Sequence, residues 1–246
     1  MRARAAGAVV LLADLGDRLV GMASGCLFSV LLVFSGYCLW DSATLAYGAM
    51  NTPAVLRAKP TQTETQAPTL AELQAANPDI RAWLTVDDTH IDYPVVQGQD
   101  DMEYINKAAD GSFALSGSIF LAAGNAADFS DAYSLIYGHH MDSGAMFGDL
   151  PHFAEADYFA DHTTGTLYLE GCACPLQIFA CLQTDAYDPV IYTANPDPVA
   201  LAEYIQKNAV QYRDTADTGR VVALSTCDES RTNGRVVVFA RLQGGN

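Results

Sequence analysis

Residues 220–242 read RVVALSTCDESRTNGRVVVFARL, and this stretch decides the class of fold. Two valine-rich runs flank a short loop of polar residues that ends in a glycine. Apolar runs bounded by turn-forming residues are typical of strands that are neighbours in a sheet. The stretch therefore predicts an antiparallel strand pair, with Cys227 at the end of the first strand and Arg235 at the start of the second.

The strand pattern continues toward the N-terminus. Six more runs have strand character: AWLTV (82–86), HIDYPVV (90–96), SGSIFL (116–121), YSLIYG (133–138), GTLYLE (165–170) and PLQIFACL (175–182). With RVVALST (220–226) and RVVVFARL (235–242) they make roughly eight short strands. Many short strands with few helices favour a closed β-barrel over an alternating β-α-β sheet.

Helical patterns are fewer. One helix is predicted to begin at Thr69, which forms a capping box with Glu72, and to end near Asn77. A second is expected near 147–160. A third is expected over 197–212, where Asp197 is the N-cap and a proline follows at the first helical position.

The composition limits the class of function. The chain has 246 residues, enough for one sizeable domain and an appendage. Its net charge is −16, with a sequence pI near 4.4, whereas binding to a phosphate backbone needs clustered lysine and arginine. Nucleic acid is therefore not an expected partner.

One segment near the N-terminus has the length and composition of a membrane anchor. LVGMASGCLFSVLLVFSGYCLW (19–40) contains no charged residue and, at about 1.5 Å per residue, spans the roughly 30 Å hydrocarbon core of a bilayer. Arg2, Arg4 and Arg18 precede it, so the positive-inside rule places the N-terminus in the cytoplasm. The alternative, a cleavable signal peptide, needs a shorter apolar region and a cleavage site of small residues.

These features predict a single-pass protein of the cell membrane whose main domain lies outside the cell. The expected order is a cytoplasmic N-terminus (1–18), a transmembrane anchor (19–40), an extracellular linker (41–68) and a folded domain (69–246). The linker is rich in threonine, glutamine, alanine and proline and shows no apolar period, which is typical of a stalk.

Four cysteines lie in the predicted external domain: Cys172, Cys174, Cys181 and Cys227. Disulfides can form in that compartment, so pairing is an open alternative for each of them. The C-x-C at Cys172 and Cys174 lacks the second ligand pair of a structural zinc site. We interpret it as part of a hairpin loop, at most as a disulfide partner of Cys181, and leave the pairing open.

The histidines do not indicate a metal either. His139 and His140 are adjacent, so in extended backbone their rings point in opposite directions. Glycine-rich phosphate loops, G-x-S-x-G and H-E-x-x-H are all absent from the sequence. No cofactor or metal is expected.

Three residues combine into a candidate catalytic site. Cys227 ends a buried-type strand and opens into a polar loop, which is where sheets present reactive groups. Arg235 is expected at the same rim, where its guanidinium can hold a carbonyl oxygen as negative charge develops. His139 follows another apolar strand and can meet them in space, as cysteine–histidine systems require. On spacing alone, the ordinary alternatives stay open: a core cysteine and a surface arginine.

The longer motifs resemble a known family. YSLIYGHHMDSGAMFGDL (133–150) and ALSTCDESRTNGRVVVFAR (223–241) resemble the two active-site segments of class B sortases. NPDIRAWLTVDDTHIDYPVVQGQDDMEYIN (77–106), SGSIFL and FACLQTDAYDPVIY (179–192) do so as well, and the resemblance covers residues 69–243. It implies a mainly β, sortase-type eight-stranded β-barrel with an N-terminal helical extension and a few surface helices, preceded by one transmembrane helix.

The resemblance also implies an activity. Class B sortases cut a C-terminal sorting motif of secreted proteins after its threonine and join the new carbonyl to an amine of a peptidoglycan precursor or of a pilin. Carried over to this chain, the nucleophile is Cys227, the acid/base is His139 and the oxyanion-side cation is Arg235, with Arg231 as the alternative cation.

A second set of residues is implied in substrate binding. Ser225 and Thr226 lie beside the nucleophile, and Asp228 matches an acidic residue that follows the cysteine in this class. The segment 184–192 resembles the loop that lines the sorting-motif groove, which makes Thr184, Tyr187 and Ile191 candidates there. Two other functions stay open: a tethered binding or scaffold protein on an inactive barrel, and a hydrolytic cysteine peptidase.

Overall fold

A computed structural model describes residues 2–50, 69–215, 219–227 and 232–244. The chain divides into two compact units, Met1–Leu45 and Ala46–Asn246. Each unit is described separately below.

The first unit consists of helix α1 (Arg2–Met50) as far as Leu45. Its segment Asp14–Thr44 contains 31 residues and is the one helical segment, within the part of the chain that the structure describes, long and apolar enough to cross a membrane. The helix continues through the first residues of the predicted linker, which are helical as far as Met50. The rest of that linker, 51–68, lies outside the described residues.

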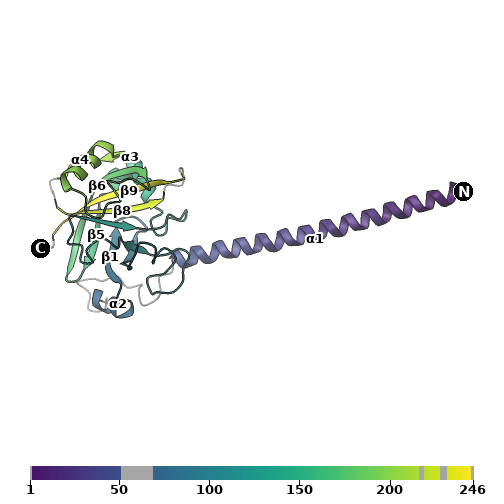
Figure 1. The fold of residues 1–246 in the computed structure, drawn as a ribbon, viewed down its shortest axis with the longest axis horizontal. Coiled ribbons are helices and arrows are strands. Elements are labelled where there is room, and N and C mark those ends of the chain that lie inside the picture. Colours follow the sequence, from purple (N-terminus) through teal and green to yellow (C-terminus); the bar gives the residue numbers. More distant parts are fainter. Residues whose placement is uncertain (1, 51–68, 216–218, 228–231, 245–246) are drawn as a thin grey trace. The chain divides into compact units, whose positions relative to one another are not determined.

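The second unit is built around a closed β-barrel (Figure 1). Its strands are β1 (Ile80–Val86), β2 (Asp92–Val96), β3 (Ile119–Leu121), β4 (Tyr133–Tyr137), β5 (Thr164–Leu169), β6 (Cys172–Asp185), β7 (Gln211–Tyr212), β8 (Val221–Cys227) and β9 (Gly234–Leu242). The order β5-β1-β2-β3-β4-β8-β9-β6 closes on itself because β6 also pairs with β5. Eight strands thus form the barrel, as predicted. The two-residue strand β7 pairs with one edge of β6.

Two of the barrel's pairings are parallel, β2 with β3 and β4 with β8, and the others are antiparallel. The parallel pairing of β4 with β8 brings segments that are far apart in the sequence to the same end of the barrel. The antiparallel pairing of β8 with β9 places Arg235, near the start of β9, at that same end.

The helices differ in part from the sequence prediction. Helix α2 (Leu70–Ala76) begins with the predicted capping box, in which Thr69 accepts from the Glu72 amide and the Glu72 side chain accepts from Thr69. The predicted helix near 147–160 is instead a 3-10 turn, η2 (Leu150–Ala154), followed by the short helix α3 (Ala156–Asp161).

The predicted helix over 197–212 is too long by one turn. Helix α4 (Pro198–Asn208) is capped by Asp197, as expected, and ends before Val210. The amide of Val210 donates to the carbonyl of Cys181, so the chain here joins the edge of β6 as β7. Pairing with an available strand edge replaces the helical hydrogen bonds.

The cysteine interpretation was wrong in one respect. Cys172 and Cys174 lie in β6 rather than in a loop, and they form a disulfide with each other. Residues two apart on a strand point to the same face, which brings these thiols together. Cys181 is fully buried and unpaired, and burial raises the pKa of its thiol to about 12.

The strands alternate between two apolar environments. One face of β8 and β9 points into the barrel, with the side chains of Val222, Leu224, Val236 and Val238. The other face packs against α4, and its cluster includes Ala223, Val237, Phe239, Leu201 and Ile205. Side chains alternate along each strand, so residues 225, 227 and 235 share the outer face with Ala223 and Val237. This is the side that α4 covers.

Leu84 tests the barrel core, since its side chain is 0% exposed inside the largest apolar cluster. We expect Leu84→Ala to lower the free energy of unfolding by about 2–5 kcal/mol, because it removes buried methyl groups and leaves a cavity. Thermal unfolding of the detergent-purified chain, followed by near-ultraviolet circular dichroism, measures this. Val199→Ala is the control, since Val199 is 67% exposed and should change stability by no more than about 0.5 kcal/mol. Equal effects of the two substitutions would contradict the assignment of the core.

Candidate active site

Cys227 is the exposed end of an otherwise buried strand. The burial pattern of β8 runs through six buried residues and ends in the exposed Cys227. Cys227 is also in no disulfide, as expected from the need for a free thiol. Asp228 and Arg231, the residues predicted to follow it in the site, lie outside the described residues.

Arg235 lies directly across the ladder from Cys227. The two residues are Cα partners in the antiparallel β8–β9 pairing, so their side chains leave the same face. Cβ atoms of residues in this relation are about 4.5–5.5 Å apart. The guanidinium of Arg235 donates to the carbonyl of Gly234 at 2.9 Å, which orients it at this rim. On its other side, Arg235 is paired in register with Thr184 of β6.

His139 is brought to the same end of the barrel by β4. Tyr137 pairs with Ser225 in the parallel ladder, and the next amide, that of Gly138, donates to the Ser225 carbonyl at 3.1 Å. The hydroxyl of Thr226 returns a hydrogen bond to the Gly138 carbonyl at 2.9 Å. His139 is the second residue after β4, and the parallel register places its backbone beside the end of β8, at Thr226 and Cys227.

The orientation of the His139 ring is set by one hydrogen bond. Nε2 of His139 lies 2.8 Å from the carbonyl oxygen of Ile105. A carbonyl can only accept, so Nε2 is the protonated nitrogen in this contact, and Nδ1 takes no part in it. An imidazole whose far nitrogen is held in this way has a fixed tautomer.

A close contact explains the glycine before His139, which sequence reasoning did not single out. A Cβ on Gly138 would lie 2.4 Å from Cδ1 of Ile119 and 2.6 Å from Cδ2 of Phe147. Both of those side chains are buried, so neither can move aside freely. Only glycine lets the chain turn out of β4 this close to the core.

Two predicted substrate residues are engaged inside the protein. Ser225 and Thr226 are each 2% exposed. The Ser225 hydroxyl lies 2.9 Å from the hydroxyl of Tyr192, while Thr226 is bonded to Gly138. In this structure they hold the segments around Cys227 together rather than face solvent.

Tyr192 is a residue of the site that sequence reasoning missed. Its ring stacks on Tyr137 with centroids 6.2 Å apart and an interplanar angle of 8°. Burial raises the pKa of Tyr192 to about 12, against the opposing effects of the Ser225 hydrogen bond and the Arg235 charge. Burial likewise raises the pKa of Tyr137. Both phenols are therefore neutral at physiological pH and form an aromatic wall beside the strand that ends at Cys227.

The other predicted groove residues are placed differently from one another. Thr184 is half-buried opposite Arg235, and its hydroxyl donates to Asp188 at 2.5 Å. Tyr187 is 79% exposed. Ile191 is 0% exposed and packs in the cluster beneath α4, so its side chain supports the loop from below rather than facing solvent.

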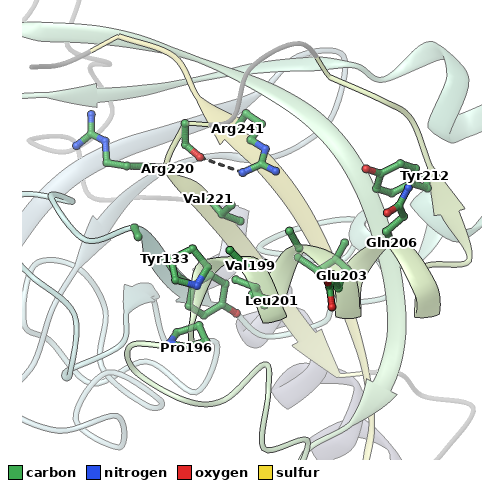
Figure 2. A pocket seen from close by; sticks show the side chains of 15 residues that line it. Tyr133, Pro196, Val199, Leu201, Glu203, Gln206, Tyr212, Arg220, Val221 and Arg241 are labelled. Atoms are coloured by element: carbon green, nitrogen blue, oxygen red, sulfur yellow. Dashed lines mark hydrogen bonds between the residues drawn. The ribbon is translucent and has the colours of Figure 1, made fainter.

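An apolar cavity lies away from this site. A cavity of about 580 Å³ lies between α4 and the start of β8, lined by Tyr133, Leu201 and Arg241 among others (Figure 2). It includes Val221 at the first position of β8, roughly 20 Å along the strand from Cys227. Among the residues that the structure describes, no group of three or more histidine, cysteine or acidic side chains is arranged to hold a metal ion.

Comparison with known proteins identifies the family, although no protein-family model matches the chain. The chain is 33% identical over 180 residues to sortase B of Listeria monocytogenes, covering 70% of this chain and 73% of that protein. It is 25% identical over 182 residues to sortase B of Staphylococcus aureus, covering 71% of this chain and 75% of that protein.

Solved structures agree. A class B sortase of Streptococcus pyogenes involved in pilus biogenesis has a TM-score of 0.66 at 41% identity, covering 70% of this chain and 97% of that chain. Sortase B of Clostridium perfringens has a TM-score of 0.66 at 31% identity, covering 71% of this chain and 99% of that chain.

A closed barrel with these relatives defines a cysteine transpeptidase of the sortase type. The chain belongs to the class B sortases.

The contact at Gly138 gives a test of how the histidine is positioned. We expect Gly138→Ala to destabilise the domain by about 1–3 kcal/mol through overpacking and to reduce transpeptidation at least tenfold, because His139 must shift with the backbone. Thermal unfolding and steady-state kinetics measure the two effects. Gly36→Ala adds the same methyl where no atom lies within 4 Å and serves as the control. Unchanged kinetics in Gly138→Ala would show that this packing does not set the histidine.

Proposed function

We propose that this sortase cleaves a C-terminal sorting motif of secreted proteins after threonine and transfers the acyl group to an amine of a cell-wall precursor or of a pilin. The observation that carries the proposal is the in-register pair of Cys227 and Arg235, with His139 held at the same end of the barrel. One S. aureus relative, 25% identical, has been solved as a sortase B–substrate complex, and the S. pyogenes relative is involved in pilus biogenesis.

In the first half-reaction, Nδ1 of His139 holds the proton that the Cys227 thiol has lost, and the resulting thiolate attacks the threonine carbonyl carbon. Arg235 stabilises the negative charge on the carbonyl oxygen, since its guanidinium stays protonated throughout. The C–N bond then breaks, and His139 protonates the departing amine through Nδ1, which leaves a thioester on Cys227.

In the second half-reaction, the acceptor amine attacks the thioester. His139 takes up the proton that this amine loses, and the bond to sulfur breaks to regenerate the thiolate. A thioester reacts well with amines, which favours transfer when water is kept out. We propose that Thr184, Tyr187 and Asp228 contact the sorting motif, and that Ser225, Thr226 and Ile191 act through the segments that they hold.

The proposal includes the location of the enzyme. The apolar part of α1 is the membrane anchor, the N-terminal arginines keep its start in the cytoplasm, and the domain from residue 69 onward acts outside the cell. Reagents that do not cross membranes should label residues of that domain on intact cells.

The test uses the full chain in detergent with pooled peptides of the N-P-x-T and L-P-x-T-G kinds and a small amine, with products read by mass. We expect a product cut after threonine that carries the amine, and we expect Cys227→Ala and His139→Ala to abolish it. His140→Ala, at the neighbouring histidine, is the matched control and should stay within about threefold of wild type.

The same assay separates the alternatives. Cleavage without amine transfer would indicate a hydrolytic cysteine peptidase. A folded protein that forms neither a thioester nor a product with any peptide would indicate a binding or scaffold protein on an inactive barrel. Loss of the product in His140→Ala, with retention in His139→Ala, would reassign the acid/base.

Arg235 gives an independent test of the oxyanion role. Arg235→Lys keeps the positive charge but loses the planar fork of donors. We expect kcat to fall by about 10²–10³-fold with a smaller change in KM, because the lost interaction forms mainly in the transition state. Steady-state kinetics with the peptide found above measure both. Arg213→Lys, at an arginine stacked on Phe159, is the control. A rise in KM alone would instead indicate that Arg235 binds the substrate backbone.

A further inference from the structure

The connection between β6 and α4, residues 186–197, lies beside the candidate active site at its start and again at Tyr192. It leaves β6 just after Thr184, which is in register with Arg235. Further on, its residue Tyr192 places a hydroxyl 2.9 Å from that of Ser225, two positions before Cys227. This connection therefore forms one side, or wall, of the region around the Cys227 thiol. The position of this wall depends on the backbone conformation of residues 186–197.

One carboxylate organises the connection. Asp188 is only 6% exposed, and its Oδ2 accepts from the hydroxyls of Thr184 at 2.5 Å and of Tyr204 at 2.7 Å. Its Oδ1 accepts from the backbone amides of Val190 at 2.9 Å and Ile191 at 3.2 Å. The four donors come from three places: the end of β6, the connection itself and helix α4.

The Tyr204 contact ties the wall to the rigid part of the domain. Tyr204 lies on α4, whose Leu201 and Ile205 are buried against the outer face of the barrel. In Figure 1, α4 lies on the same side of the barrel as β6, against which it packs. The carboxylate thus links a strand, a loop and a packed helix through one group.

The charge on Asp188 makes this link strong. Burial by itself would raise the pKa of its carboxyl, but the hydrogen bonds from Thr184, Tyr204 and the two amides lower it below its ordinary value. Hydrogen bonds to an ionised acceptor are roughly twice as strong as those between neutral groups. Because the folded pKa lies below the unfolded one, this contribution is present at neutral pH and is lost as the pH falls through the folded value.

We propose that Asp188 is a positioning residue for the reaction, which fixes the 186–197 connection as a preformed wall of the substrate groove. The proposal rests on the proposed function. Asp188 acts through Tyr192 and Thr184, not on the reacting atoms. A wall that is ordered before the substrate arrives lowers the entropy cost of binding, so its loss affects binding more than chemistry.

The kinetic test compares Asp188→Ala with the wild-type chain in detergent. We expect KM for the sorting peptide to rise at least tenfold, kcat to stay within about threefold, and the rate of Cys227 alkylation by iodoacetamide to be unchanged. Asp188→Asn keeps an acceptor oxygen and should recover part of the loss. Tyr204→Phe removes only the link to α4, and we expect a KM increase of about threefold.

The matched control is Asp128→Ala. Asp128 also caps its own loop, accepts from the amide of Ser130 at 3.0 Å and has a lowered pKa, owing first to the hydrogen bonds from Ser130. Asp128 lies in the connection between β3 and β4. We expect the KM of Asp128→Ala for the sorting peptide to remain within twofold of the wild-type value. This control separates loss of the Asp188 contacts from loss of any capping carboxylate.

A second measurement needs no substrate. Hydrogen exchange in Asp188→Ala should accelerate at residues 186–197 at least tenfold, while β8 and β9 remain protected. If the wild-type chain transfers no peptide, the proposed function fails, and this measurement still tests the positioning of the connection. The proposal is overturned if KM stays within twofold in Asp188→Ala, if kcat falls as much as KM rises, or if exchange in the connection is unchanged. If Asp188→Ala does not fold, the same criteria apply to Tyr204→Phe, with a threefold KM increase as the expected result.

Discussion

The parallel pairing of β4 with β8 is the contact on which the candidate active site depends. It sets Tyr137 against Ser225, so the chain leaves β4 at His139 where β8 is about to end at Cys227. The antiparallel partner β9 then starts at this same rim and places Arg235 opposite the thiol. Residues 139, 227 and 235 lie at the same end of the barrel because backbone hydrogen bonds fix the register of three central strands. A slip of one residue would turn the side chains of one strand to the other face.

The sequence predicted most of this framework, because its signals are local. All eight barrel strands have apolar runs with turn residues between them, and the strand pair around Cys227 is visible in one stretch of 23 residues at 220–242. The ends of elements were less predictable. Val210 leaves its helix because the edge of β6 is free to accept it, and Cys172 belongs to β6 because that strand continues past Pro175 to pair with β5. Both outcomes depend on which distant segment of the chain lies next to the element. A local sequence pattern does not contain that information.

The surroundings of the site were predicted least well, for the same reason. Sequence reasoning did not single out Tyr192, Gly138 or Asp188, although all three lie in segments that resemble the family. Each acquires its role from a tertiary contact, with Ser225, Phe147 and Tyr204 respectively. Ser225 and Thr226 were predicted as substrate-binding residues because they precede Cys227 in the sequence. They do lie next to Cys227 at the end of β8. Their burial shows that a residue next to a reactive group in sequence can serve the framework, since alternate side chains on a strand face different environments.

The arrangement of the thiols follows from the same barrel geometry. An exposed free thiol can be oxidised, and a second accessible thiol next to it would trap it as a disulfide. In the described part of the domain, Cys181 is buried within the barrel, and Cys172 and Cys174 are bonded to each other. They also lie at the end of β6 remote from Thr184, about 33–40 Å along the strand from the residue that pairs with Arg235. The fold thus separates Cys227 from the other thiols of the described barrel by burial, by prior pairing and by distance, so that its thiol stays free.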